Sequence, residues 1–442
     1  MSMKNVVHGY LPDERPPLGK LVLFALQQIL VMFPATVLVA LLTGFHVSTT
    51  IFASGFATLC FILVTKGKIP LYYGSSFSYI AAIVGITGAK FGVTAPDALI
   101  SAAQFGIIMS GLVSILAGVI VSRFGLSSIE KVLPPSVTGS IAIVIGISLA
   151  STAITNAASN GGGPVLNINW IAALVTLFAT ILFSVYLKGV WAQLPILLGI
   201  LFGYAVSFAL GMVDLTQIFA GNILQAPHFT LPDFSAWNAV FAIMPIAIAT
   251  IPESTAHLFQ LDIYVNDLAR KKGAPEVKIA DKLGINLIGD GIGDIVSSLF
   301  GGPAGTNYGE NLSTMAITKN FSVWVLGAAA VITMFISFFS PLTNLVRSIP
   351  SSVINGACIY LFGIIGAQGI AIMIERKVDM FSSKNLAVIA VILIVGLGGS
   401  YGFPGGMIPF NGWNLPAIAT ASVVGILLNL ALSFKKADTT VE

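Results

Sequence analysis

Long apolar runs with very little charge constrain this sequence more than any other feature. Of its 442 residues, 56% are hydrophobic and 9% are charged, whereas a soluble domain carries about 25% charged residues. A chain so poor in charge cannot cover a surface that faces water, so a lipid bilayer must be its main solvent. Apolar runs that could cross the bilayer, or partly cross it, lie near 18–43, 47–65, 70–88, 98–122, 133–153, 168–187, 191–213, 238–261, 281–300, 303–318, 322–341, 350–374, 383–401 and 413–434. We therefore predict an all-α polytopic membrane protein with 14 transmembrane segments.

The basic residues predict the orientation of these segments. If the N-terminus is cytoplasmic, the Lys and Arg residues, 21 in all, lie in the tails or in the even-numbered cytoplasmic connections, with the exceptions of Lys90 and Arg347. The positive-inside rule predicts this bias. We expect a multi-pass protein of the bacterial plasma (inner) membrane whose tails, 1–17 and 435–442, are both cytoplasmic.

A short repeated sequence predicts that the chain has two halves of opposite orientation in the membrane. The sequence Leu-Pro-Pro-Ser-Val at 133–137 opens the fifth segment, and Ile-Pro-Ser-Ser-Val at 349–353 opens the twelfth. The third and tenth segments, which Gly, Ser and Thr interrupt, are also seven segments apart. Paired broken segments in matching halves point to a transporter binding site near the bilayer midplane. We predict seven-segment repeats at 18–213 and 238–434, joined by an external connection at 214–237.

Four acidic residues fall in apolar context, namely Glu253, Asp290, Asp294 and Glu310. Ionisable groups inside a membrane are costly and usually face an internal cavity. On a helix, Glu253 and His257 lie one turn apart and could share a proton near neutral pH, which suits proton coupling. Asp290 and Asp294 would share one helix face, where two like charges repel. We predict a structural or relay role for this second pair rather than contact with a substrate.

The tenth segment is too polar around residues 305–311 for an ordinary span. It predicts non-helical backbone followed by a helix that begins near Gly309 and offers free N–H groups near the midplane. Residues 73–78, Tyr-Gly-Ser-Ser-Phe-Ser, are the matching piece of the first half. Together with Phe77 and Tyr308, these two helix ends would form a slot for a flat polar ring.

Several function classes lack their motifs in this sequence. It contains no G-x-x-x-x-G-K-[ST] loop for ATP and no Cys/His spacing for a metal. We therefore predict a protein that is not an enzyme, that needs no cofactor or metal, and that has no nucleic-acid partner. A proton gradient would supply the energy.

The residues from Tyr308 to Lys319 resemble the signature of the nucleobase–cation symporters, also called nucleobase–ascorbate transporters. Residues 66–70 and 74–77 are similar to those of bacterial uracil permeases in particular. The resemblance covers essentially the whole chain. It implies two inverted repeats of seven segments, with short β-like stretches in segments 3 and 10. It also implies a core domain of segments 1–4 and 8–11, a gate domain of segments 5–7 and 12–14, and a homodimer.

The resemblance further implies proton symport of a nucleobase, most similar to uracil import, by alternating access. Glu253 and Glu310 would accept the N–H groups of the base, and backbone N–H groups near Phe77 and Gly309 would donate to its carbonyl groups. His257 would lie beside Glu253 in the proton path. The remaining candidates, with a supporting or relay role, are Asp290, Asp294, Ser76, Asn311 and Thr255.

Three other functions compete with this interpretation. A xanthine or other purine symporter of the same family would share every feature except the pairing with the base edge, and Asp290 resembles that branch. An anion transporter of similar fold is disfavoured, because two carboxylates would repel an anion and segments 3, 8 and 10 carry no interior Lys or Arg. A membrane-embedded enzyme is disfavoured by the missing catalytic motifs.

Overall fold

The computed structural model describes residues 9–125, 131–158, 167–216, 218–219, 221–410 and 413–433. The predicted tail 435–442 lies outside the described residues, as do residues 1–8 of the N-terminal tail.

The chain is mostly helical, which confirms the all-α prediction. In the first half the helices are α1 (Leu18–Thr43), α2 (Val47–Val64), α3 (Ile80–Thr87), α4 (Asp97–Phe124), α6 (Pro135–Ser148), α7 (Ala150–Ala158), α8 (Ile168–Tyr186) and α9 (Pro195–Ala209). In the second half they are α10 (Trp237–Ile243), α11 (Ala247–Lys272), α12 (Leu283–Leu299), α13 (Gly309–Thr318), α14 (Val323–Ile336), α15 (Ser340–Arg347), α16 (Ser351–Glu375), α17 (Ser383–Gly402) and α18 (Ala417–Ser433). Short 3₁₀ turns are η1 (Phe77–Tyr79), η2 (Gly189–Gln193), η3 (Met244–Ile246), η4 (Ala280–Lys282) and η5 (Pro404–Gly406).

The helices have the length and surface of a multi-pass membrane protein. Within the described residues, 8 helices are long and apolar enough to cross a bilayer, and shorter apolar helices add to them at α9, α14, α18 and residues 77–87. Large apolar side chains point outward from these helices: Leu63, Phe335, Ile374 and Ile394 are 72–75% exposed. Such side chains would be unfavourable in water and are suited to contact with lipid.

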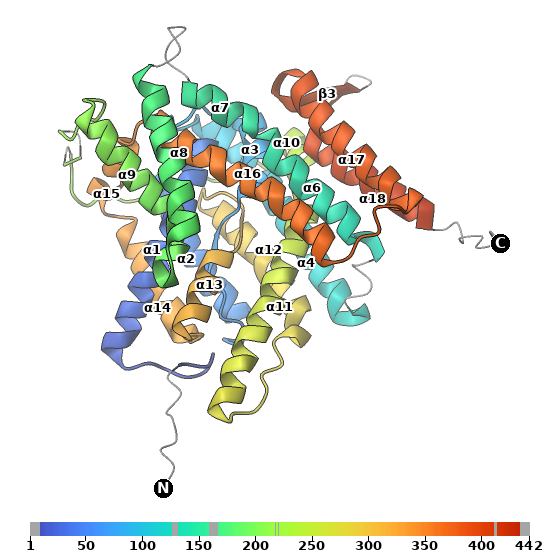
Figure 1. Ribbon diagram of the computed structural model, residues 1–442, viewed down its shortest axis with the longest axis horizontal. Helices are drawn as coiled ribbons and strands as arrows, with labels where there is room; N and C mark the ends of the chain where they lie inside the picture. Colours follow the sequence, from blue (N-terminus) through green and yellow to red (C-terminus); the bar gives the residue numbers. More distant parts are fainter. Residues whose placement is uncertain are drawn as a thin grey trace.

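Two groups of helices pack mainly among themselves (Figure 1). In the first group α4 packs along α12, α2 packs against α12 and α14, and α1 packs against α14. In the second group α16 packs against α6, α7 and α8, and α17 packs against α6 and α18. Two short paired strands, residues 73–75 and 305–307, pack against α2 and α12 of the first group. We call this strand pair the crossing.

Strands break the chain where segments 3 and 10 are predicted, as the resemblance implied. Strand β1 (Tyr73–Ser75) pairs antiparallel with β2 (Gly305–Asn307), and Gly74 lies opposite Thr306. All six residues are buried. The backbone N–H and carbonyl groups of buried strands need hydrogen-bond partners. Pairing between the two strands supplies these partners where neither segment is helical.

Several predicted segments differ from the helices observed. The segment predicted at 238–261 divides into α10, η3 and α11, and α11 extends to Lys272. The segment predicted at 413–434 begins with β4 (Trp413–Pro416), which forms a hairpin with β3 (Met407–Phe410) before α18 starts. Gly405 and Gly406 adopt positive φ angles of 63° and 68°, a conformation that lets the chain turn at the end of α17. The segment predicted at 322–341 ends at Ile336, and the segment predicted at 133–153 divides into α6 and α7.

Candidate functional site

The paired strands place two helix starts beside each other near the centre of the first helix group. After β1 the chain enters η1 at Phe77, and the Ser76 hydroxyl accepts a hydrogen bond from Ser78 N–H at 3.3 Å. After β2 the chain enters α13 at Gly309, where the sequence predicted a helix start. The first N–H groups of a helix have no partner within the helix. Both starts therefore offer backbone hydrogen-bond donors, and the start of α13 lies against α11.

Tyrosine rings hold the crossing together. The Tyr308 ring packs where a side chain on Gly74 would stand, and the Tyr73 ring packs where one on Gly305 would stand. The Tyr308 hydroxyl group donates to the Ser75 carbonyl at 2.9 Å and lies 3.1 Å from the Thr36 hydroxyl on α1. Because Tyr308 is 3% exposed and its hydroxyl group is occupied, its side chain packs the crossing rather than lining an open slot.

Helix α11 brings Glu253 and His257 to the start of α13. A Cβ atom at Gly309 would lie 2.8 Å from His257 Nε2, so only a glycine permits this approach of α13 to α11. The His257 ring contacts the backbone of Asn307, and its Nδ1 is buried without a hydrogen-bond partner. Glu253 and Glu310 lie close enough for their charges to interact.

The predicted binding and proton-coupling residues other than Tyr308 share a partly accessible position. Phe77, Glu253, His257, Gly309 and Glu310 all keep intermediate exposure, whereas most residues beside them in sequence are buried. Side chains that lie within a helix bundle and yet keep some accessible surface are expected to border a hollow. Their roles in substrate binding and proton coupling stay predictions.

Asp290 lies behind this group and connects α12 to α11 and β2. Its carboxyl group accepts hydrogen bonds from the Ser254 hydroxyl and, at 2.8 Å, from Asn307 Nδ2. Asn286 Nδ2 donates to the same Ser254 hydroxyl at 2.7 Å. Since Ser254 adjoins Glu253, this network fixes the segment of α11 that carries Glu253.

Asp294 has separate partners one turn further along α12. It accepts hydrogen bonds from the Tyr73 hydroxyl at 2.5 Å and from the Gly305 N–H group at 2.8 Å. The repulsion expected between Asp290 and Asp294 is therefore countered by donors from β1, β2 and α11. Each acid holds a different part of the crossing in place.

The other predicted supporting residues also make structural contacts. Ser76 donates its N–H group to the Ala304 carbonyl at 2.9 Å, which extends the strand pairing by one bond. Asn311 Nδ2 donates to Gln28 Oε1 on α1 at 2.7 Å. The Thr255 hydroxyl bonds back to the Ile251 carbonyl at 2.7 Å within α11.

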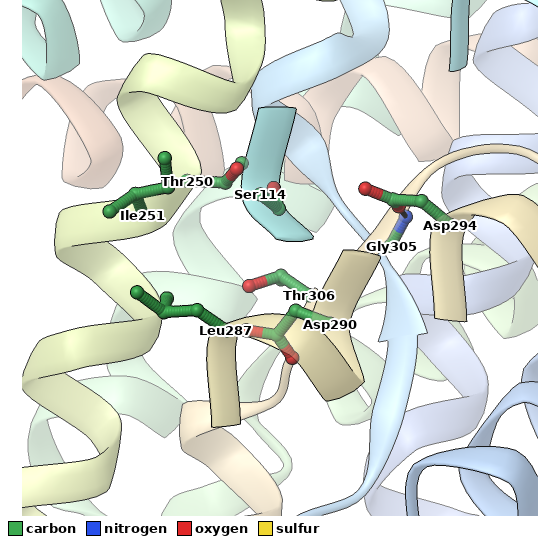
Figure 2. Close-up of a pocket in the computed structure, with 8 residues that line it drawn as sticks. All are labelled: Ser114, Thr250, Ile251, Leu287, Asp290, Asp294, Gly305 and Thr306. Carbon is green, nitrogen blue, oxygen red and sulfur yellow. Dashed lines mark hydrogen bonds between the residues drawn. The ribbon is translucent and has the colours of Figure 1, made fainter. Parts of the chain in front are cut away.

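A small cavity is lined by Asp290 and Asp294 of α12 together with Thr306 of β2 (Figure 2). Its water-accessible space is about 10 Å³, enough for about one water molecule. Side chains reach it from α4, α11, α12 and β2, and the lining residues are Ser114, Thr250, Ile251, Leu287, Asp290, Asp294, Gly305 and Thr306. The Thr306 hydroxyl is buried without a hydrogen-bond partner, so this cavity suits a buried water rather than a substrate.

The site holds four acidic side chains without a basic counterpart. Among the described residues, none of the ion pairs involves Glu253, Asp290, Asp294 or Glu310. No Lys or Arg occurs in residues 73–87, 247–269 or 283–318. A neutral or cationic ligand with N–H donors suits such a site, and an anion does not.

Sequence reasoning did not assign a role to Tyr73, Asn286 or Asn307, although all three hold the acids in place. Polar residues in apolar runs are the signal that could have marked Asn286 and Asn307. The role of Tyr73 depends on a contact between residues 221 positions apart, which no local pattern reveals.

Comparisons with known proteins find similar sequences over nearly the whole chain. A family model described as the Permease family matches residues 19–405. The chain is 37% identical to the uracil permease of Bacillus caldolyticus, covering 95% of this chain and 94% of that protein. It is 35% identical to the uracil permease of Bacillus subtilis (strain 168), covering 99% and 98% respectively.

A solved structure shows the same fold in a more distant protein. The murine Solute Carrier 26 family member A9 anion transporter, in its inward-facing state, superposes with a TM-score of 0.67. The alignment covers 97% of this chain and 72% of that chain at 14% sequence identity. A likeness at this level concerns the fold alone.

Proposed function

This chain belongs to the nucleobase–ascorbate transporter family of permeases, and from that premise we propose that it is a transporter that imports uracil. It is a transporter rather than an enzyme. The observation that carries the proposal is the meeting of Glu253 and Glu310 at the start of α13.

The chemistry of uracil matches this arrangement. The base is neutral and presents two N–H donors and two carbonyl acceptors on one flat ring. Carboxylate groups accept N–H donors strongly where water is excluded. Glu253 and Glu310 would each accept one, the free N–H groups at the starts of η1 and α13 would donate to the carbonyl groups, and Phe77 would cover the ring.

We propose proton symport with Glu253 and His257 as the coupling residues. They lie one turn apart on α11, and the buried His257 Nδ1 has no protein partner. Protonation of this pair would change the charge beside the base and bias which side of the transporter opens.

The finer topology follows the same proposal. We propose 14 segments in two inverted repeats of seven, with both termini cytoplasmic in the bacterial inner membrane. The two helix groups support a division into core and gate, since α16–α18 pack with α6–α9 and α10–α14 pack with α1–α4. Movement of one group against the other would give alternating access, and we propose that the protein is a homodimer.

A purine is the second candidate substrate. The resemblance of Asp290 to the purine branch of the family favours it, and Asp290 accepts a hydrogen bond from Ser254, the residue next to Glu253. A purine would use the same two carboxylates with a different base edge.

Uptake of radiolabelled uracil into proteoliposomes with an imposed inward proton gradient tests the proposal. Unlabelled xanthine, adenine and cytosine serve as competitors, and Glu253→Gln and Glu310→Gln are measured beside the exposed-loop control Asp214→Asn. We expect gradient-dependent uptake that only uracil and close pyrimidines block, lost in both glutamine variants and kept in the control. Accumulation of xanthine without uracil would assign the purine branch, and uracil uptake that ignores the gradient would contradict symport.

A further inference from the structure

Two histidines and an aspartate meet at one end of the first helix group, away from the crossing. His46 precedes α2, Asp97 is the first residue of α4, and His228 lies in the extended segment between α9 and α10. His46 Nε2 lies 3.2 Å from Asp97 Oδ1, and His228 Nε2 lies 2.8 Å from Asp97 Oδ2. The two imidazole rings stand 4.4 Å apart between centroids.

Contacts outside the cluster hold each of these residues in place. The Thr49 hydroxyl on α2 donates to the His228 carbonyl at 2.6 Å. Two residues further on, Thr230 and Gln104 on α4 exchange hydrogen bonds of 2.8 and 2.9 Å. The segment that carries His228 is thus fixed to both α2 and α4.

His46 is fixed by a tight turn at the end of α1. Gly44 adopts a positive φ of 77°, and its carbonyl accepts the Ala95 N–H group at 2.8 Å. Phe45 is 2% exposed and anchors the turn in the core. Ligand positions that are fixed independently of one another are a property of built sites rather than of chance surface contacts.

We propose that His46, Asp97 and His228 form a binding site for a divalent transition metal ion, with Zn²⁺ as the representative ion. One ligand atom from each residue lies within 4.8 Å of the other two. Ligands of a tetrahedral Zn²⁺ ion lie about 3.3 Å apart, given metal–ligand distances of about 2.0–2.1 Å. Small rotations of the two rings would bring the three atoms to that spacing.

The donor set also suits such an ion. Two imidazole nitrogens and one carboxylate oxygen favour Zn²⁺ and its neighbours over Mg²⁺ or Ca²⁺, which prefer oxygen ligands. The His228 and Asp97 side chains are 55% and 54% exposed, so an ion can enter from water and retain a water as its fourth ligand.

Three connections contribute to the site, and all three fall on one side in the topology proposed above. They are the connections after the first, third and seventh segments, which that topology places outside the cell. Arg347 lies close enough for its charge to reach His46, and its guanidinium donates to the Thr94 hydroxyl at 3.3 Å. This positive charge opposes a cation, so Arg347→Gln should tighten binding by about two- to fivefold.

Zinc titration of the purified full-length protein in detergent tests the proposal. Isothermal calorimetry and competition with a chromophoric chelator both measure the dissociation constant. We expect one saturable site in the wild type, weakened at least about tenfold in His46→Ala, His228→Ala and Asp97→Asn. Asp214→Asn, which changes an exposed carboxylate outside the cluster, should bind as the wild type does.

Two further measurements keep the test decisive if a variant is unstable. Asp97→His replaces one ligand type with another and should retain binding, and Co²⁺ in place of Zn²⁺ should give an absorption spectrum typical of imidazole ligation. Zn²⁺ should raise the thermal unfolding midpoint of the wild type but not of the alanine variants. Equal Zn²⁺ affinity in the wild type and the His46→Ala/His228→Ala double variant, or no saturable binding in the wild type, would overturn the proposal.

Discussion

The two strand–helix units of the crossing share one backbone plan and differ in chemistry. The first unit, residues 73–87, runs from β1 through η1 into α3 and carries no charged side chain. The second unit, residues 305–318, runs from β2 into α13 and carries Glu310 in the first turn of its helix. Pairing of the strands fixes the backbone of both units, and the charge is confined to one of them.

The second unit also receives most of the contacts that the buried acids and His257 make with the two units. Asp290 and Asp294 bond to Asn307 and to the Gly305 N–H group, and His257 stands against Gly309. The first unit receives a single bond from these acids, through the Tyr73 hydroxyl. We infer that the second unit recognises the polar edge of the base, while the first supplies an apolar surface and backbone donors.

The largest expected effect is a contrast between Glu310→Gln and Phe77→Leu. Removing the carboxylate takes away a charged acceptor for a substrate N–H group, at a cost of about 3 kcal/mol or roughly 100-fold in affinity. Phe77→Leu keeps an apolar surface and loses aromatic stacking, a cost of about 1 kcal/mol or roughly fivefold. Equilibrium binding of radiolabelled uracil in detergent measures both, and an equal loss in the two variants would break the contrast between the units.

The next effect concerns the close approach of α13 to α11. In Gly309→Ala the added methyl group would stand 2.8 Å from His257 Nε2, so α13 or the imidazole must shift. We expect uracil affinity to fall about tenfold, since misplaced hydrogen-bonding groups lose about 1–1.5 kcal/mol. Gly327→Ala on α14 is the matched control, because a Cβ there meets nothing within 4 Å. Unchanged affinity in Gly309→Ala would mean that the two helices are not held this closely.

Sequence patterns predicted the helices better than the contacts between them. The run at 18–43 matches α1 at both ends, and the helix start near Gly309 is confirmed. Long apolar runs and a polar interruption leave a local signature that hydropathy detects. The hairpin of β3 and β4 was missed although its strands are separated in the sequence by Asn-Gly, a pair typical of two-residue hairpin turns.

Contacts across long sequence separations explain what could not be predicted. Spacing on one helix suggested that Asp290 and Asp294 repel, and only the fold shows that each has donors from other elements. The His46, Asp97 and His228 cluster joins residues 51 and 131 positions apart, so no motif search along the chain would find it.

A smaller contrast compares the two tyrosines of the crossing. Tyr73→Phe removes a donor to a buried carboxyl group and should lower the free energy of unfolding by about 2 kcal/mol. Tyr308→Phe removes a bond to the Ser75 carbonyl, a neutral acceptor, and should cost about 1 kcal/mol. Thermal unfolding in detergent, followed by tryptophan fluorescence, measures the difference. A larger loss in Tyr308→Phe would show that the bond from the second unit to the Ser75 carbonyl contributes more than the bond from Tyr73 to Asp294.

The smallest expected effect on stability concerns the C-terminal ends of the two units. An ion pair lies near the end of the second unit, and a neutral hydrogen bond holds the end of the first. The first unit ends at Thr87, whose hydroxyl donates to the Thr43 carbonyl at 3.0 Å. Beyond the second unit, the Tyr10 N–H group donates to the Lys319 carbonyl at 2.8 Å. In the same N-terminal segment, the Glu14 carboxylate oxygens accept hydrogen bonds of 2.6 and 2.5 Å from Lys272 Nζ on α11.

This ion pair predicts a pH-dependent contribution to stability. Partial burial disfavours the charged form of Glu14, but hydrogen bonds from Lys272 and from the Leu11 N–H group outweigh it and hold the pKa of Glu14 below its usual value. A carboxyl group with a lowered folded-state pKa stabilises the fold at pH values above its unfolded pKa, about 4.3, and this stabilisation is lost as the pH falls through the folded-state pKa. Because the two side chains are 21% and 37% exposed, solvent screens the pair, and Glu14→Gln should cost only about 0.5 kcal/mol at pH 7.

The unfolding midpoints of Glu14→Gln and the wild type should therefore differ slightly at pH 7 and converge as the pH falls to 4 and below. A difference that widens on acidification would show that Glu14 does not act through its charge.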